Sequence, residues 1–413
     1  MTPIILTICG LLLLAYIFDI NSSKTKIPSV IILLILGWLV KVTVDFLEIQ
    51  IPDLQPILPI LGTMGLVLIV LEGSLELEIK KRKLPFIGKS FIIAFLSIIL
   101  FSFIFGYILH SVEGISFKYG LANAIPISII SSAIAIPSVQ NLISRNREFV
   151  VYETSLSDIL GVVFFNFIVF NEHIGFYSVG DFIVKLIFIL IISFIVTLGL
   201  SYLMSKINHT VKYTPIIIIL ILIYAVSKIY NLPALLFILL FGIFLANIDK
   251  LKRYKHIQKL KPDILRAEVH KFRDLTAEIS FLIRSLFFLL FGYLVEVSEL
   301  INSETILWAL GISASIYIIR FILLKIFRIS LTPLLYVAPR GLITILLFLS
   351  IPLEQSSIYI NKSLILQIII ITTLIMTFGM IPSKGRKKKL SSNNRNNPEN
   401  EPTQILSSEE NSI

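Results

Sequence analysis

The chain of 413 residues is 56% apolar and 15% charged, and its mean hydropathy is +0.91. Soluble domains contain about 25% charged residues, so this composition excludes an ordinary water-soluble globule and a disordered chain. The single cysteine, Cys9, also excludes a disulfide-stapled scaffold. The remaining class is a polytopic membrane protein.

Thirteen apolar stretches are long enough to cross a bilayer as helices, which takes roughly 20 residues. Barrel strands would be about 10 residues long with alternating polarity, so the sequence predicts an all-α polytopic membrane protein. The predicted spans are 3–18, 27–43, 56–75, 85–110, 119–143, 149–170, 180–205, 213–229, 232–248, 274–297, 304–324, 329–351 and 363–382. No cleaved signal peptide is expected, because Met1 to Ile5 include no basic residue.

The charges of the loops predict the orientation. Loops after even-numbered spans carry only Lys41, Lys118, Lys228 and Lys362, whereas loops after odd-numbered spans and the tail are rich in Lys and Arg. Basic loops face the cytoplasm. We therefore expect the amino terminus outside a plasma or inner membrane and the carboxyl terminus in the cytoplasm. The same bias accounts for the net charge of +10 without a nucleic-acid partner.

The thirteen spans divide into two six-helix halves that begin on opposite sides of the membrane. We predict a transmembrane domain at 1–382, with inverted repeats at about 1–170 and 213–382 and a linker helix at 180–205. Inverted repeats of this kind build many secondary transporters. Residues 383–413 are rich in Ser, Asn, Glu and Pro and are predicted to be a disordered cytoplasmic tail. For the basic segment 250–273, we expect a linker, with an interfacial helix as the alternative.

The fifth span of each half is interrupted. The interrupting residues are Pro126 and Pro137 in the first half, and Pro333, Pro339 and Gly341 in the second. Proline removes a backbone donor from a helix, and unpaired backbone in a membrane is tolerated only inside protein or beside water. Two crossed broken helices around a midplane site are therefore predicted, although prolines in membrane helices can also be simple kinks.

Asp158 is the strongest candidate for an intramembrane functional residue, because a carboxylate is costly there. Helical spacing places Thr154 and Ser155 on its face, and Ser157 precedes it. These oxygens suit a small alkali cation. In the alternative interpretation, the hydroxyls bond back to helix carbonyls and Asp158 pairs with a basic side chain.

Arg320 lies within a predicted span and requires a carboxylate partner. The candidates are Glu153, Asp158 and Glu72. Arg340, in the second interrupted span, is placed to balance the partial charges of two half-helix ends.

The sequence lacks the residue patterns that metal sites and ATP-driven proteins require. The five histidines lie at span ends or in loops without ligand spacing, and no phosphate-binding loop occurs. We therefore expect no enzyme, no cofactor and no metal beyond a transported alkali ion.

Several short stretches resemble motifs of a known family and occur in the same order. They are Leu71-Glu72-Gly73-Ser74-Leu75-Glu76, Glu153-Thr154-Ser155-Leu156-Ser157-Asp158, Phe241-Gly242 through Ala246-Asn247, Ile319-Arg320 and Pro339-Arg340-Gly341-Leu342. Together they resemble the monovalent cation:proton antiporter superfamily, on its sodium/proton exchanger side. The chain departs from the family at Ser157, where Asn is usual, and at Ala135-Ile136 before Pro137, where Thr-Asp is usual. Ser131-Ser132-Ala133-Ile134 resembles the potassium/proton branch instead.

The resemblance implies a role for each matching residue. Asp158 would bind cation and proton alternately, Thr154 and Ser157 would lend oxygens, and Glu153 would form a structural ion pair with Arg320. Glu72, Pro137, Pro339 and Arg340 would support the crossover. It also implies core and dimerisation domains in a homodimer.

The expected activity is exchange of Na⁺, with K⁺ or Li⁺ as alternatives, for H⁺ by alternating access with 1:1 electroneutral stoichiometry. Two rival functions stay open. A passive cation channel requires a continuous pore with a filter, and none is visible in the sequence. A sodium-coupled symporter of organic anions requires a more polar crossover than Ala135 and Ile136 provide.

Overall fold

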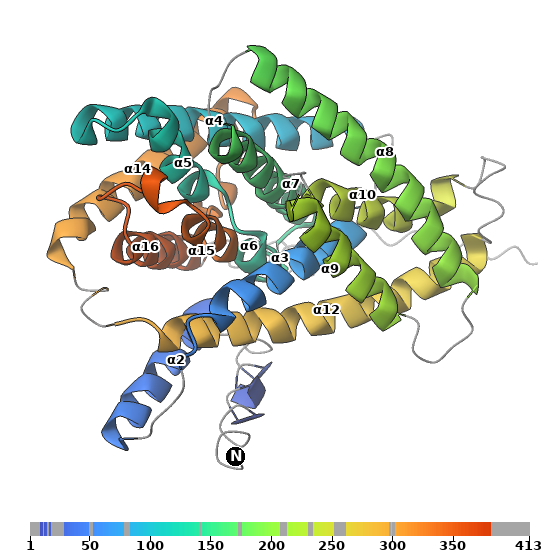
Figure 1. Cartoon of the computed structure of the whole chain (residues 1–413), viewed down its shortest axis with the longest axis horizontal. Helices are drawn as coiled ribbons and strands as arrows, with labels where there is room; N and C mark the ends of the chain where they lie inside the picture. Colours follow the sequence, from blue (N-terminus) through green and yellow to red (C-terminus); the bar gives the residue numbers. More distant parts are fainter. Residues whose placement is uncertain are drawn as a thin grey trace, which may run out of the picture.

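The computed structural model describes residues 9–10, 12–14, 16–17, 29–48, 53–77, 83–140, 142–171, 176–206, 213–229, 234–251, 262–296, 299 and 302–380. Within these residues the fold is helical throughout, as predicted (Figure 1). The α-helices are α2 (Ser29–Phe46), α3 (Ile57–Leu75), α4 (Leu84–Glu113), α5 (Phe117–Ser128), α6 (Ser132–Ser138), α7 (Ser144–Phe170), α8 (Phe176–Lys206), α9 (Tyr213–Ile229), α10 (Ala234–Ala246), α12 (Pro262–Tyr293), α14 (Ser303–Ile326), α15 (Leu342–Leu349) and α16 (Lys362–Met380). Short 3₁₀ turns are η2 (Ile248–Leu251), η3 (Leu334–Tyr336) and η4 (Leu353–Gln355).

In the described part of the chain, nine helical segments are long and apolar enough to cross a membrane, and α9 and α10 contribute two shorter apolar helices. These elements match the predicted spans from 27–43 onward. The predicted span 3–18 falls on residues that are described only in part, and the predicted tail 383–413 lies outside the described residues.

The expected linker at 250–273 is wrong for its second half, because α12 already begins at Pro262. Leu265, Val269 and Phe272 are buried at helical spacing between charged residues. This stripe packs inward and extends the helix beyond the predicted start at residue 274.

Helix α7 lies in the middle of the molecule (Figure 1). Helices α4, α5, α6 and α3 pack against it, while α12 runs along one side and contacts both α2 and α3. Glycines allow the closest contacts: a Cβ added to Gly120 of α5 would lie 2.3 Å from the carbonyl oxygen of Gly106 in α4. The backbones of α4 and α5 are therefore in direct contact.

Both predicted interruptions are present. The first is an extended segment, residues 129–131, between α5 and α6, and the second is residues 337–341 between η3 and α15. Pro126 and Pro137 lie inside α5 and α6, so the first break falls between the prolines rather than at them. The Ser131 N–H donates to the carbonyl oxygen of Pro339 at 2.8 Å, which joins the two extended segments where they cross.

Polar contacts at one end of α4 and α5 hold the loop that follows α15. The Glu113 carboxylate accepts from the hydroxyl of Ser357 and, at 2.8 Å, from the N–H of Ile358. The amide of Asn123 bonds the carbonyl of Gln355 at 2.7 Å and the N–H of Ser357 at 3.1 Å. These contacts satisfy backbone groups that would otherwise be unpaired in the loop.

Candidate functional site

The candidate site lies on α7, where all the residues singled out from the sequence are buried. Glu153 and Thr154 have no exposed surface, and Asp158 is 1% exposed. Ser157 and Ser155 are also buried. Charged side chains this far from water need specific partners, so their contacts define what the site can do.

The partner of Asp158 comes from the first broken helix. The hydroxyl of Ser132 donates to Asp158 Oδ2. Asp158 Oδ1 is buried and has no hydrogen-bond partner. One oxygen of the carboxyl is therefore held by α6, and the other is available for a proton or a cation.

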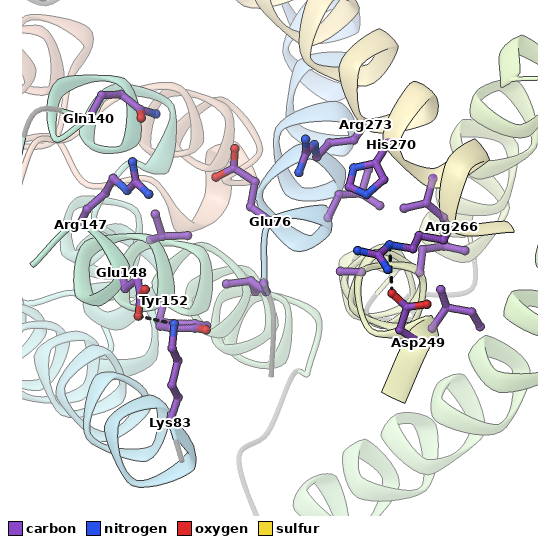
Figure 2. A pocket seen from close by; sticks show the side chains of 17 residues that line it. Glu76, Lys83, Gln140, Arg147, Glu148, Tyr152, Asp249, Arg266, His270 and Arg273 are labelled. Carbon is purple, nitrogen blue, oxygen red and sulfur yellow. Dashed lines mark ion pairs between the residues drawn. The ribbon is translucent and has the colours of Figure 1, made fainter. Parts of the chain in front are cut away.

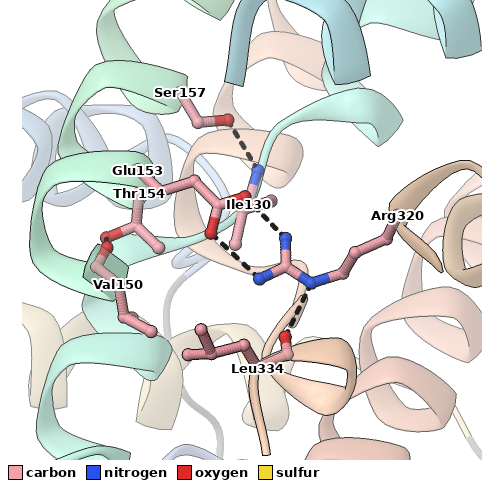
Figure 3. Close-up of polar contacts among 7 residues, drawn as sticks. All are labelled: Ile130, Val150, Glu153, Thr154, Ser157, Arg320 and Leu334. Atoms are coloured by element: carbon pink, nitrogen blue, oxygen red, sulfur yellow. Dashed lines mark hydrogen bonds and ion pairs between the residues drawn. The ribbon is translucent and has the colours of Figure 1, made fainter. Parts of the chain in front are cut away.

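The hydroxyls of α7 do not all point at Asp158. Thr154 Oγ1 donates to the carbonyl of Val150 at 2.8 Å, as in the alternative interpretation of the sequence. Ser157 Oγ accepts the N–H of Ile130 at 3.1 Å and so anchors the extended segment of the first broken helix (Figure 3). Ser155 Oγ is buried without a partner. The hydroxyl that touches Asp158 belongs to Ser132, which was not among the predicted site residues.

Glu153 and Arg320 form a bidentate ion pair between α7 and α14 (Figure 3). Arg320 Nη1 and Nη2 donate to Glu153 Oε1 and Oε2 at 2.7 and 2.9 Å, and Nε donates to the carbonyl of Leu334 at 2.8 Å. Two parallel charge-assisted bonds give this pair a fixed geometry. Of the three carboxylates considered for Arg320, the structure brings Glu153 to it.

Arg340 lies in the second crossover, next to Pro339, and is 3% exposed. Its backbone N–H donates to Thr372 Oγ1 at 3.1 Å, while Nε and Nη1 have no hydrogen-bond partner. A cavity of about 10 Å³, lined in part by Ser97 and Arg320, lies beside it. This volume matches one water molecule.

An inner cavity of about 460 Å³ reaches the first broken helix. Its lining includes Ser132 and Pro137 of α6, Glu72 of α3, and Glu278 and Arg284 of α12. Glu72 therefore faces the cavity and does not contact Arg320. The cavity therefore lies next to the residue that hydrogen-bonds Asp158.

Figure 2 shows the residues that line a second cavity, of about 410 Å³. It shares Glu76 and Gln140 with the inner cavity, so the two are adjacent. Glu76 follows the last residue of α3 and lies between Arg147 and Arg273 in Figure 2. Partial burial and the nearby Glu72 carboxylate raise the pKa of Glu76, against the opposing effect of the two arginines.

Ion pairs bridge neighbouring elements around the second cavity. Lys83 Nζ lies 2.7 Å from Glu148 Oε2, and Arg266 Nε lies 3.1 Å from Asp249 Oδ2 (Figure 2). Both pairs are partly exposed, so each adds little to stability. They neutralise part of the charge at this opening.

Comparisons with known proteins agree with the geometry. Two structures of the sodium proton antiporter MjNhaP1 from Methanocaldococcus jannaschii are similar to the chain at 21% identity and a TM-score of 0.64. The structure at pH 8 is matched over 91% of this chain and 94% of that one, and the electron-microscopy map over 98% and 100%. No curated protein matches the sequence. The family model "Sodium/hydrogen exchanger, transmembrane" matches residues 10–383, and the chain belongs to this family of transporters.

Proposed function

We propose that the protein is a secondary active antiporter that exchanges Na⁺ for H⁺ at Asp158, with K⁺ or Li⁺ as the alternative cations. Family membership supports cation/proton antiport in general. The single observation that carries the site is the Asp158 carboxyl, which is 1% exposed, has one oxygen without a hydrogen-bond partner, and is bonded to Ser132 in the lining of the inner cavity.

Exchange follows from competition for one carboxyl group. Burial disfavours an ionised carboxyl, so Asp158 holds either a proton or a dehydrated alkali ion that supplies the countercharge. If only the loaded carboxyl can cross between the two sides, each inward proton accompanies one outward cation. No cofactor and no ATP are needed, because the gradient of one ion drives the other.

Alternating access would move the bundle that holds α4–α7 and α14–α16 against the remaining helices. The predicted orientation places residues 76–83, 140–148 and 249–273 on the cytoplasmic side, and described residues of each segment line the second cavity. In that orientation the inner cavity would lie next to a cavity on the cytoplasmic side, with which it shares Glu76 and Gln140. The structure would then represent an inward-facing state.

We expect electroneutral 1:1 stoichiometry. The Glu153 carboxylate cancels the charge of Arg320, and Arg340 carries a fixed charge through both half-cycles. The net charge carried across therefore depends on what Asp158 binds, and each of its two loads has charge +1.

Two rival functions are less well supported. A channel needs a continuous water-filled pore, whereas Asp158 is 1% exposed. A symporter of organic anions would be expected to have polar residues at positions 135 and 136, where this chain has Ala135 and Ile136. A homodimer remains a proposal that rests on the family resemblance, and cross-linking in native membranes tests it.

The test uses inside-out vesicles or proteoliposomes with an imposed pH gradient, acidic inside. Adding Na⁺, K⁺ or Li⁺ should dissipate the gradient for the wild type, and Asp158→Asn should abolish the response. Asp45→Asn, the same substitution on the exposed end of α2, is the matched control and should behave as wild type. Dissipation by Asp158→Asn at the wild-type rate would refute the proposed site.

A further inference from the structure

Ser132 occupies a position that the proposed mechanism has not yet used. It is the first residue of α6, is 4% exposed and lines the inner cavity. Its hydroxyl donates to Asp158 Oδ2. Asp158 itself is not part of the cavity lining. Ser132 therefore connects the inner cavity to the buried carboxyl.

The backbone around Ser132 is held on two sides. The Ile130 N–H donates to Ser157 Oγ of α7 at 3.1 Å, and the Ser131 N–H donates to the Pro339 carbonyl at 2.8 Å. With the chain fixed in this way, the position of the Ser132 Cβ is set, while its hydroxyl hydrogen stays free to rotate. A hydroxyl has one donor and two acceptor lone pairs.

This geometry allows two hydrogen-bonding states. In one state the hydroxyl donates to the carboxyl of Asp158, as in the structure. An alkali ion that arrives from the cavity reaches Ser132 before Asp158, and it attracts the oxygen lone pairs rather than the hydrogen. Rotation of the hydroxyl would then present its oxygen to the ion beside the carboxylate.

We propose that Ser132 is a specificity-determining residue of the cation site, whose hydroxyl oxygen coordinates the ion together with Asp158. This inference rests on the proposed antiport function at Asp158. It assigns the hydroxyl ligand to the broken helix α6, whereas Thr154 of α7 directs its hydroxyl to a helix carbonyl.

The experiment measures the apparent KM for Na⁺ and Li⁺ and the maximal rate in proteoliposomes at one fixed pH. Ser132→Ala should raise the KM for Na⁺ about ten-fold, the effect of losing one bond to a charged group, and leave the maximal rate within about two-fold. Ser132→Cys, which replaces the oxygen with a soft sulfur ligand of similar size, should raise the KM similarly. Ser132→Thr, which keeps the hydroxyl, should have a KM for Na⁺ close to that of the wild type.

Ser138→Ala is the matched control. It removes a hydroxyl from the same short helix, but Ser138 Oγ donates to the Ile134 carbonyl at 2.7 Å, so the KM should stay at the wild-type value. If Ser132→Ala and Ser132→Cys both show the KM of Ser138→Ala, the inference is wrong. A loss of maximal rate at unchanged KM would also overturn it.

Asp158→Asn in the same assay separates the two proposals. If Asp158→Asn is inactive and Ser132→Ala keeps the wild-type KM, the role of Ser132 fails and the proposed function stands. If Asp158→Asn exchanges cations like the wild type, the proposed function itself fails.

Discussion

The backbone of Ser131 is hydrogen-bonded to the backbone of Pro339, with 2.8 Å between the nitrogen and the oxygen. Ser131 belongs to the first broken helix and Pro339 to the second. Each segment has backbone groups without a helical partner, so this bond satisfies one donor and one acceptor inside the protein. The crossing point is thus closely packed as well as polar.

Gly341 should be sensitive to any added side chain. A Cβ there would lie 2.7 Å from Ser131 Oγ and 2.8 Å from Ile134 Cδ1. Gly341→Ala should therefore destabilise the protein by about 1–3 kcal/mol through overpacking and slow transport. Thermal unfolding in detergent measures the loss of stability, and the antiport rate in proteoliposomes measures the slower transport. Gly311→Ala, inside α14 where no atom lies within 4 Å of an added Cβ, should not destabilise the protein, because alanine is the better helix former; equal behaviour of the two variants would contradict the prediction.

Removing one member of the Glu153–Arg320 pair should cost more than removing both. Either Glu153→Gln or Arg320→Met leaves a charge that is almost fully buried without its partner, at a cost of about 3–5 kcal/mol. The double variant should recover part of this loss. A double-mutant cycle of thermal stability measures the coupling, and strictly additive effects of the two substitutions would show that the pair contributes none.

If exchange is electroneutral, the transport rate should not depend on the membrane potential. Potassium diffusion potentials of either sign, set with valinomycin in proteoliposomes, should leave the initial rate of Na⁺-driven proton movement unchanged. A rate that rises with one sign and falls with the other would show that net charge crosses, and would rule out the 1:1 stoichiometry.

Glu76 should make stability depend on pH. Its pKa is raised by partial burial and by Glu72, so the ionised form is less favourable in the folded protein than in the unfolded chain. The associated stability is present below the ordinary pKa of Glu and is lost as the pH rises through the raised value. Glu76→Gln should therefore increase the unfolding temperature at pH 8 but not at pH 4. Glu354→Gln, the same substitution in η4 and away from both cavities, is the control and should change the unfolding temperature equally at the two pH values.

Hydropathy predicted the helices well because the membrane imposes their length and composition. It failed at residues 262–273, where Leu265, Val269 and Phe272 are separated by charged residues that lower the average. A search for helical periodicity, instead of mean hydropathy, identifies this stripe.

The residues of the candidate site could be predicted from the sequence, but the contacts between different helices could not. Asp158 stands out because a carboxylate in a span is costly, and Arg320 because it needs a carboxylate. The contact between Ser132 and Asp158 spans 26 positions and depends on how α6 docks against α7. Spacing within one helix carries no information about that docking, so Thr154 was the natural choice of hydroxyl.

The contact between Gly106 and Gly120 has a mechanical consequence. Because these backbones touch, α4 cannot slide or separate from α5 without opening a gap in the bilayer interior. We therefore expect α4 to move together with α5 and the first crossover as one rigid body. Spectroscopic labels on the lipid-facing side of α4 would then measure the displacement of this bundle during transport without altering the ion pathway.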